Sequence, residues 1–418
     1  MNDMFMSRIK EYIDSDKIIS IVKNLCELIE ENDTNIDVIE KLSLVLRLKE
    51  IEDKEKNEII ALLMMYSNNS KKLRAKNIFL NEAEILEKKI ILKSKPRRMV
   101  VSITNRCNLR CLMCGQHFEQ QYDIGENAYN FVRNTIPYLE EVKWQGGEVF
   151  LFNKFNELVE LCNKYKVYQL IATNGLLINE KNIKLFLGDN IHLHFSIDAV
   201  DKETYERIRV GANYNSLLNS LELVKKYVRK ENKIMAFVVM NLNYKQIKEA
   251  IYFAINYGFG MIKFQRIIAF DFCENLELSK EQEKEAIKTI EYYQRQSREG
   301  IINIEIESDL SLDFCNDCDK NNVDYNDKNA DCSNKVDSNV SVQNKKLYCI
   351  APWTTLCIFN NDTIRFACSG SEVSVEQDLW NAEDINKYRK QIVNNDLSCC
   401  NSTCSTRGFE AIKTKIGL

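Results

Sequence analysis

Apolar positions in the first part of the chain recur every three to four residues, as in DKIISIVKNLCELIEEN (16–32) and NEIIALLMMYS (57–67). This spacing predicts amphipathic helices, and no strand pattern interrupts it. We therefore expect residues 1–92 to form an all-helical N-terminal domain, with Cys26 on the apolar face of its helix.

From residue 98 onward, short runs of β-branched and aromatic residues alternate with stretches of helical spacing. Strands are predicted at 98–105, 141–145, 167–175, 191–198, 233–240 and 261–268, and helices at 127–139, 155–166, 179–187, 203–208, 216–231, 244–257 and 279–298. Successive strand–helix units predict a parallel α/β sheet with helices outside it. Six units are too few for a closed eight-unit barrel, so we expect an open, partial (β/α)6 barrel over residues 93–312. In such folds, chemistry gathers at the carboxyl ends of the strands.

Beyond this barrel, residues 313–347 are rich in Asn, Asp, Ser and Lys, which predicts a polar surface insertion, disordered in character. Residues 348–418 form a small cysteine-rich region with a hairpin around the Asn-Asn-Asp turn at 360–362 and a helix at 383–394.

The composition is that of a globular protein, with 45% hydrophobic and 28% charged residues and a net charge of −4 over 418 residues. No apolar run reaches the length of a membrane span, and the start of the chain lacks the apolar core of a secretory signal. We expect a cytoplasmic protein that binds neither membrane nor nucleic acid. The best basic cluster, KSKPRR (93–98), lies in an apparent linker and has no interleaved aromatics.

Fifteen cysteines are too few for a disulfide-stapled secreted chain of this length. In a reducing compartment, clustered thiols favour metal ligands or reactive groups. The three histidines weaken any hypothesis of multi-histidine zinc catalysis or a Ser-His-Asp triad.

The cysteines of CNLRCLMCG, namely Cys107, Cys111 and Cys114, follow the first predicted strand with C-x3-C-x2-C spacing. A four-iron cluster usually takes four cysteine ligands. Three ligands leave one iron open, as catalytic zinc sites leave one position open, so a small molecule can bind there.

This loop resembles the C-x3-C-x2-C motif of the radical S-adenosylmethionine (SAM) enzymes. The resemblance implies a 4Fe-4S cluster whose open iron binds SAM, and reductive cleavage of SAM to a 5′-deoxyadenosyl radical that abstracts hydrogen from substrate. Companion motifs occur in the order seen in that family: WQGGEVF (144–150), TNG (173–175) and FSIDAVDKETYERIR (195–209).

The resemblance also implies roles for individual residues. In the Gly-Gly-Glu motif, two glycines let backbone approach a ligand closely, and the glutamate accepts from the methionine ammonium group. An arginine suits the SAM carboxylate or ribose because its guanidinium can bind a carboxylate bidentately. The implied SAM-binding residues are Gly146, Gly147, Glu148, Asn174, Ser196, Asp198 and Arg209. Met113 stands where the family often has an aromatic residue, so its contact with adenine is less specific.

Three further residues are catalytic candidates. His192 and His194 alternate along a strand with Ser196 and Asp198, so all four are expected on one face, where the histidines can touch substrate or pass protons. A hydrogen-bonded histidine without a chemical role is the favoured alternative. Cys273 follows the sixth strand and is either a site residue or a buried thiol, whereas Cys162 is predicted to be core.

The terminal cysteines resemble those of the SPASM/twitch extension of this family, which carries an auxiliary 4Fe-4S cluster. The resemblance assigns Cys349, Cys368, Cys400 and Cys404 as its ligands. The closing spacing differs from the usual C-x2-C, so Cys399 competes with Cys400, and a zinc knuckle remains an alternative. Metal binding stays open for Cys315, Cys318, Cys332 and Cys357.

The resemblance implies an oxidoreductase-like enzyme that attacks an unactivated C–H bond, with a peptide or protein side chain favoured as substrate. The modification would be a crosslink, an epimerisation or an oxidation, with electrons from a flavodoxin or ferredoxin. Alternatives are a sugar, aminocyclitol or other polar small molecule, and a non-catalytic iron–sulfur electron carrier. A carrier needs no SAM site, so the Gly-Gly-Glu motif and Arg209 speak against it. Residues 1–92 could also bind a partner protein.

Overall fold

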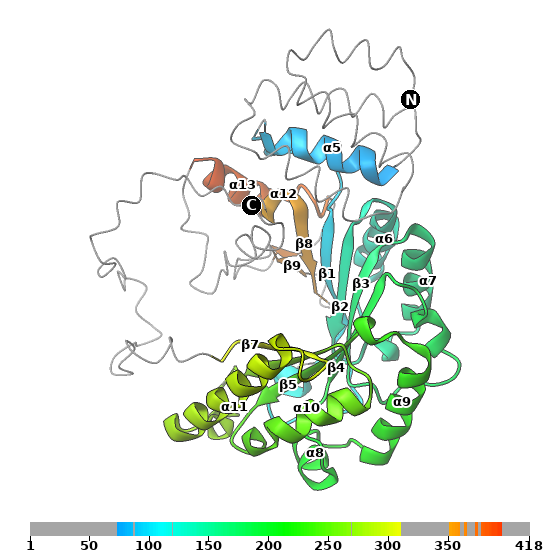
Figure 1. The fold of residues 1–418 in the computed structure, drawn as a ribbon. Coiled ribbons are helices and arrows are strands. Elements are labelled where there is room, and N and C mark those ends of the chain that lie inside the picture. The colour runs from blue at the N-terminus through cyan, green and yellow to red at the C-terminus, as the bar shows by residue number, and fades with distance from the viewer. Residues whose placement is uncertain are drawn as a thin grey trace, which may run out of the picture.

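The computed structural model describes residues 73–310, except 87, 119 and 269, and residues 351–394, except 360–362, 366–372 and 375–377. All six predicted strands are present and lie side by side in parallel (Figure 1). They are β1 (Arg98–Thr104), β2 (Glu141–Gly146), β3 (Tyr168–Thr173), β4 (Ile191–Ser196), β5 (Lys233–Val239) and β6 (Met261–Arg266).

The sheet is larger than the sequence predicted, with the strand order β10-β9-β8-β1-β2-β3-β4-β5-β6-β7. Parallel pairing continues to β7 (Glu305–Ser308) at one side and to β8 (Thr355–Ile358) at the other. The predicted hairpin exists as the antiparallel pair of β8 with β9 (Thr363–Arg365), and β10 (Val373–Ser374) follows β9. The hairpin thus extends the sheet of the barrel, because β8 is bonded to β1.

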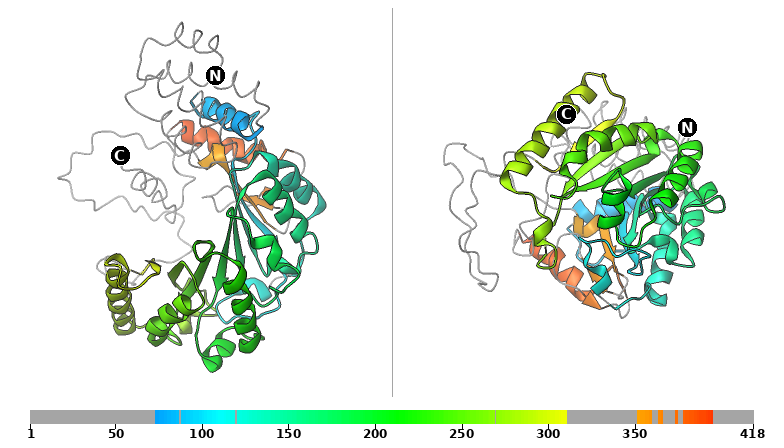
Figure 2. Two further views of the ribbon diagram at one scale, coloured as in Figure 1. Left: turned by 45° about the vertical axis from the view of Figure 1, so that its right-hand side comes forward. Right: turned by 90° about the horizontal axis from the view of Figure 1, so that it is seen from below.

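Helices cover the outer side of this curved, open sheet (Figure 2). They are α6 (Glu126–Thr135), α7 (Phe155–Tyr165), α8 (Lys202–Ile208), α9 (Tyr214–Tyr227), α10 (Ile247–Asn256) and α11 (Lys280–Arg298). The helix expected at 179–187 is only a 3₁₀ turn, Ile183–Phe186. These elements confirm an α/β partial barrel.

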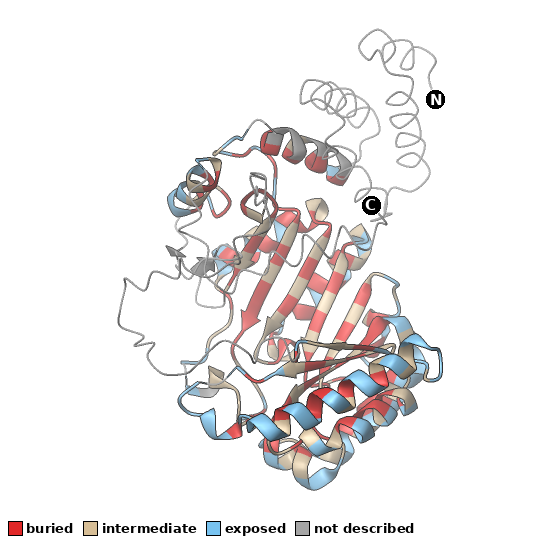
Figure 3. Cartoon of the chain, turned by 60° about the vertical axis from the view of Figure 1, so that its left-hand side comes forward, coloured by how far each residue is buried: buried red, intermediate tan, exposed pale blue. Residues whose placement is uncertain are grey.

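Burial alternates along the strands, as the striped colouring in Figure 3 shows. In β4, Leu193 and Phe195 are fully buried under the helices, whereas His192 and His194 are half-buried on the inner face. The core therefore lies between sheet and helices, and the half-buried inner face mixes polar side chains such as His192 with apolar ones such as Leu170 and Ile234.

Residues 1–72 of the predicted helical domain lie outside the described residues, and the described remainder contains α5 (Leu73–Leu86). This helix packs beside α12 (Ala351–Thr354), which itself contacts α13 (Glu383–Val393), at the end of the sheet where β1 and β8 begin (Figure 1). The predicted insertion at 313–347 also falls outside the described residues.

One buried arginine ties this helical group together. The Arg389 side chain is fully buried and donates hydrogen bonds of 2.9 Å to the backbone oxygens of Pro352, Ile90 and Trp380. Its guanidinium also lies 4.7 Å from the centre of the Trp380 ring, within the range of a cation–π contact. Segments before β1 and after β8 are thereby joined.

The basic run at 93–98 is built into this end of the molecule. Arg97 is buried and bonded through two nitrogens to the carboxylate of Glu140. Lys95 pairs through its backbone with the Asn77 side chain at 2.7 and 3.0 Å. Within the described ranges, we find no helix with the length and apolar character needed to span a bilayer.

Candidate functional site

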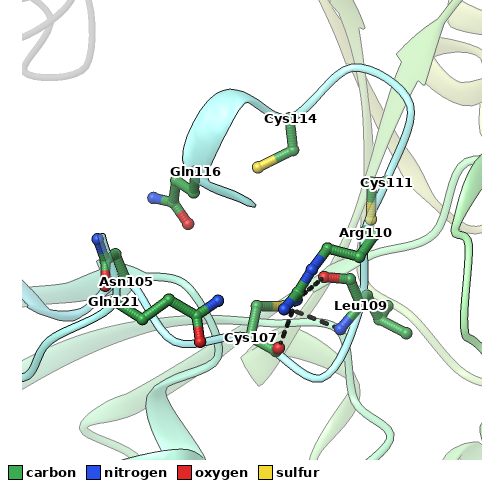
Figure 4. A pocket seen from close by; sticks show the side chains of 8 residues that line it. All are labelled: Asn105, Cys107, Leu109, Arg110, Cys111, Cys114, Gln116 and Gln121. Carbon is green, nitrogen blue, oxygen red and sulfur yellow. Dashed lines mark hydrogen bonds between the residues drawn. The ribbon is translucent and has the colours of Figure 1, made fainter. Parts of the chain in front are cut away.

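The cysteine loop follows β1 at the carboxyl edge of the sheet, where the fold predicts chemistry. Its three cysteines line one pocket (Figure 4), in which Cys111 is buried and Cys107 and Cys114 are half-buried. The rest of the lining consists of Asn105, Leu109, Arg110, Gln116 and Gln121.

On one side, the loop is fixed to the Gly-Gly-Glu motif after β2. Gly147 donates its backbone N–H to Thr104 O at 2.7 Å, and Glu148 donates to Arg106 O at 2.8 Å. A Cβ on Gly146 or Gly147 would lie 2.1 Å from these same two carbonyl oxygens, and Gly146 also has φ +127°. We expected the glycines to allow close approach of a ligand; in the structure, the group that they approach is the backbone leading to Cys107.

On the other side, the loop is bonded to the end of α8. Arg110 donates to Val210 O at 2.8 Å, and Leu112 donates to Ile208 O at 3.0 Å. These bonds hold Arg209 beside the loop. Its Nη1 lies 3.8 Å from the sulfur of Cys111.

Two residues that the sequence analysis missed stiffen the start of the loop. Arg106 binds both carboxylate oxygens of Asp123 at 2.8 Å and also donates to Leu151 O at 2.6 Å. Thr104 donates to the same aspartate at 2.6 Å. An arginine directly before the first cysteine is the one feature of the sequence that could have pointed to this anchor.

Glu148 is completely buried beneath the loop. Its carboxylate accepts hydrogen bonds of 2.8 Å from the Thr173 hydroxyl and from the Asn174 backbone. Burial raises the pKa of Glu148 to about 7, and these two bonds partly oppose the rise. Asn174 in turn donates to the Asn108 side chain at 2.8 Å, with its amide nitrogen 4.0 Å from the Cys107 sulfur.

Asp198 and Arg209 form a buried ion pair of 2.5 Å at the same edge of the sheet. Asp198 also accepts from Val238 N at 2.8 Å. Burial alone would lower the pKa of Arg209, but interactions with its neighbours, chiefly the negative charge of Asp198, outweigh burial and raise the pKa. The Arg209 Nε is buried without a hydrogen-bond partner, so one N–H of this guanidinium remains able to bind an anionic ligand.

The thiols themselves resist ionisation. Burial raises the pKa of Cys111 to about 11, although the charge of Arg209 opposes this, and burial also raises the pKa of Cys107. Metal coordination deprotonates a thiol outright, so such cysteines become thiolates when they bind iron. Among the described residues, no three acidic, histidine or cysteine side chains converge closely enough for a single metal ion. In an iron–sulfur cluster, each cysteine binds a different iron, and the three cysteines around this pocket are of the type that such clusters use.

The other candidates lie elsewhere. His192, His194 and Ser196 lie on the inner face of β4, and the His192 ring packs 4.8 Å from that of Tyr168. Cys273 is fully buried in the core, outside the pocket lining. Cys162 is also fully buried, which confirms the prediction that it is core.

Met113 is partly buried against the hydrophobic core beside the loop. The proposed auxiliary ligands Cys349, Cys368, Cys400 and Cys404 lie outside the described residues, as do Cys315, Cys318, Cys332 and Cys399. Cys357 is described and lies half-buried in β8.

Comparison with known sequences supports this geometry. Residues 101–254, which include the loop, the Gly-Gly-Glu motif and Arg209, match the radical SAM superfamily. A GTP 3′,8-cyclase of Synechocystis sp. is 28% identical over 165 residues, which cover 38% of this chain and 50% of the relative. A probable GTP 3′,8-cyclase of Methanococcus aeolicus is 25% identical over 267 residues, which cover 58% of this chain and 87% of the relative. The chain spans about half the length of the first curated relatives it matches.

Among solved structures, Streptococcus suis SuiB has a similar fold, with a TM-score of 0.55 and 15% identity over 84% of this chain and 81% of SuiB. SuiB bound to the precursor peptide SuiA matches with a TM-score of 0.52 and 16% identity, over 75% of this chain and 70% of SuiB. At this identity, the likeness concerns the fold. Residues 101–254, which contain the three-cysteine loop and strands β2 to β5 of the open half-barrel, thus match the radical SAM superfamily.

Proposed function

We propose that the chain is an enzyme that holds a 4Fe-4S cluster on Cys107, Cys111 and Cys114 and binds SAM at the open iron. When bound, the two groups supply the one-electron cleavage chemistry that removes hydrogen from an unactivated C–H bond. The observation that carries the proposal is one pocket lined by these cysteines, with Arg209 Nη1 beside Cys111 and the buried Nε of the same guanidinium without a hydrogen-bond partner.

The residues around the loop suit the two ends of the SAM methionine moiety. The Glu148 carboxylate accepts hydrogen bonds from the Thr173 hydroxyl and from the backbone of Asn174 and Phe150. A carboxylate has about four acceptor sites, so one remains for an ammonium group. Arg209 offers its free Nε–H to a carboxylate, while Asp198 fixes the guanidinium in place. Binding and orientation are thus the proposed work of these side chains. An electron carrier would need neither group.

We propose a peptide or protein side chain as substrate. The support is the shared fold with SuiB, whose structure was solved with a precursor peptide. A polar small molecule is the second candidate, because the curated relatives are named GTP 3′,8-cyclases. Transfer of deuterium from labelled candidates into 5′-deoxyadenosine distinguishes the two substrate classes.

The first test is anaerobic reconstitution of the full chain with iron and sulfide, followed by SAM and a reductant. We expect 5′-deoxyadenosine without substrate, and loss of both this product and cluster iron in Cys111→Ala. Cys162→Ala, which removes a buried thiol outside the pocket, is the matched control and keeps both. A cluster that is fully coordinated and spectroscopically indifferent to SAM would disprove the proposal.

We also propose an auxiliary 4Fe-4S cluster on Cys349, Cys368, Cys400 and Cys404, and a flavodoxin or ferredoxin as electron donor. Cys404→Ala then lowers the iron content of reconstituted protein by about half, if each cluster holds four irons. Comparing Cys399→Ala with Cys400→Ala identifies the ligand of that pair. Unchanged iron in Cys404→Ala and Cys349→Ala rejects the auxiliary cluster.

A further inference from the structure

The inner face of the sheet carries a polar surface that the proposed SAM site does not use. Lys143 is level with Leu170, and Leu170 with His192, in the register of β2, β3 and β4. Lys263 is level with Ala236, and Ala236 with Ser196, in β4, β5 and β6. The half-buried polar residues of this face include the carboxylates Glu141 and Glu307 and the side chains of Lys143, Gln145, His192, His194, Ser196, Lys263 and Gln265.

Lys143 has no ion-pair partner among the described side chains. Its pKa is lowered, first by burial and then by the positive charge of Lys263. Two ammonium groups that repel one another on a shielded surface are unfavourable unless an anion lies between them.

His194 faces the same space with an unmet hydrogen-bonding group. Its Nε2 is buried and has no hydrogen-bond partner. Burial lowers the pKa of His194 to about 4, and the charges of Lys143, His192 and Lys263 add to the effect. The ring is therefore neutral at pH 7 and can present one N–H to a ligand.

The carboxylates of this face already have cationic partners. Glu307 lies 3.3 Å from Lys263, and Glu141 lies 3.9 Å from Arg98. Both pairs are partly exposed, so each is weak. Cys357 and then Glu141 raise the pKa of Lys143, but each does so less than burial and Lys263 lower it.

We propose that Lys143, His194 and Lys263 form a subsite that binds an anionic group of the substrate, either a carboxylate or a phosphate. Charged N–H donors bind both groups strongly, and the anion would relieve the repulsion between the two lysines. The assignment of this group to the substrate rests on the proposed function; the ability to bind an anion does not.

Binding of inorganic phosphate and of acetate to the reconstituted full chain tests the subsite. Affinity is measured by titration calorimetry, and the reactivity of each lysine toward succinimidyl acetate by peptide mass spectrometry. We expect one of the two anions to bind and to slow the labelling of Lys143 at least threefold. Preference for phosphate indicates a phosphorylated small molecule, and preference for acetate indicates a carboxylate such as a peptide carries.

Lys143→Met should weaken binding of that anion at least fivefold, and Lys263→Met should weaken it less because of Glu307. Lys181→Met, which removes an exposed lysine outside the strands of the sheet, is the matched control and leaves affinity unchanged. If Lys143→Met does not fold, the effect of the anions on the labelling of Lys143 in the wild-type protein tests the subsite by itself.

The subsite is wrong if neither anion slows labelling of Lys143, or if Lys143→Met binds both anions as the wild type does. Formation of 5′-deoxyadenosine without substrate is measured on the same preparation. Cleavage without anion binding rejects the subsite alone, whereas anion binding without cleavage rejects the proposed function and leaves the subsite in place.

Discussion

At the scale of single residues, the roles of the motif glycines and of Glu148 can be separated. The glycines are needed where two backbone segments meet, because a Cβ there would overlap Thr104 O or Arg106 O. The same contact fixes the backbone of Glu148, whose N–H donates to Arg106 O, and burial of the side chain raises the pKa of its carboxyl group. Its protonation therefore matters near neutral pH.

Affinity for SAM should fall as the pH is lowered from 7 to 6. The pKa of Glu148 is about 7 in the cofactor-free protein, so acidification protonates the group that would accept from the SAM ammonium. Once the group is mostly protonated, affinity should drop by about tenfold for each pH unit. Anaerobic titration calorimetry at pH 6 and 7 measures the change.

In Glu148→Gln, SAM binding should be weaker and no longer depend on pH in this range. Glu160→Gln changes an exposed glutamate of α7 and serves as the control. Equal affinity and an equal pH profile in Glu148→Gln and the wild type would remove Glu148 from the SAM site.

Gly147→Ala should displace the cysteine loop. The added Cβ would lie 2.1 Å from Arg106 O, so the strand end and the loop must separate. We expect a loss of about 1–3 kcal/mol of stability and at least tenfold slower cleavage of SAM. Thermal unfolding and 5′-deoxyadenosine formation are the measurements.

Gly300→Ala is the control for the close contact, because an added Cβ at Gly300 would contact nothing within 4 Å, although Gly300, unlike Gly147, has a positive φ (+73°). The stability of Gly300→Ala should fall only by the energy of backbone strain at a positive φ, about 1 kcal/mol. Equal behaviour of the two variants would show that the close contact at Gly147 is unimportant.

At the scale of elements, six strands could be predicted because each alternates or clusters β-branched and aromatic residues. β7 was missed since its sequence, EIES, is short and charged. The segment of β8 was expected in a local hairpin, and its partner β1 lies far away in the chain, where no sequence pattern can indicate pairing. The Arg106–Asp123 anchor was missed for the same reason.

Lys233, the first residue of β5, should make stability depend on pH. It is 2% exposed, and burial, followed by the charge of Lys225, lowers its pKa to about 8. Since the unfolded pKa is higher, the folded state disfavours the charged form below pH 8. The free energy of unfolding should therefore rise between pH 8 and about 10.4, where a free lysine titrates.

Lys233→Met should abolish this rise and be more stable than the wild type at pH 7 by about 1–2 kcal/mol. Urea unfolding at pH 7 and 10 measures both effects. Lys248→Met, at an exposed position of α10, should keep the wild-type dependence. If the free energy of unfolding of Lys233→Met rises with pH as that of the wild type does, groups other than Lys233 cause the rise.

At the scale of the whole molecule, stability and chemistry lie at opposite ends of the sheet. The cysteine loop follows the carboxyl end of β1, whereas α5, α12 and α13 gather where β1 and β8 begin (Figure 1). In barrels built of β/α units, residues at the amino end chiefly serve stability.

Arg389→Met should destabilise the protein by about 3 kcal/mol or more, because three backbone oxygens lose their buried donor. At temperatures below the unfolding transition, the iron content and the rate of SAM cleavage of this variant should stay close to those of the wild type. Arg133→Met, which breaks an exposed ion pair with Glu157, should change the stability little, because exposed pairs contribute little. A comparable loss in both variants would contradict the role of Arg389.

The pairing of β8 with β1 has a consequence for biosynthesis. β1 is made early, yet Arg98 aligns with Thr355, which leaves the ribosome much later. Until then, one side of β1 presents unpaired N–H and C=O groups that invite pairing with another nascent chain. Slow translation or truncation before residue 355 therefore exposes an aggregation-prone strand at the centre of the finished sheet.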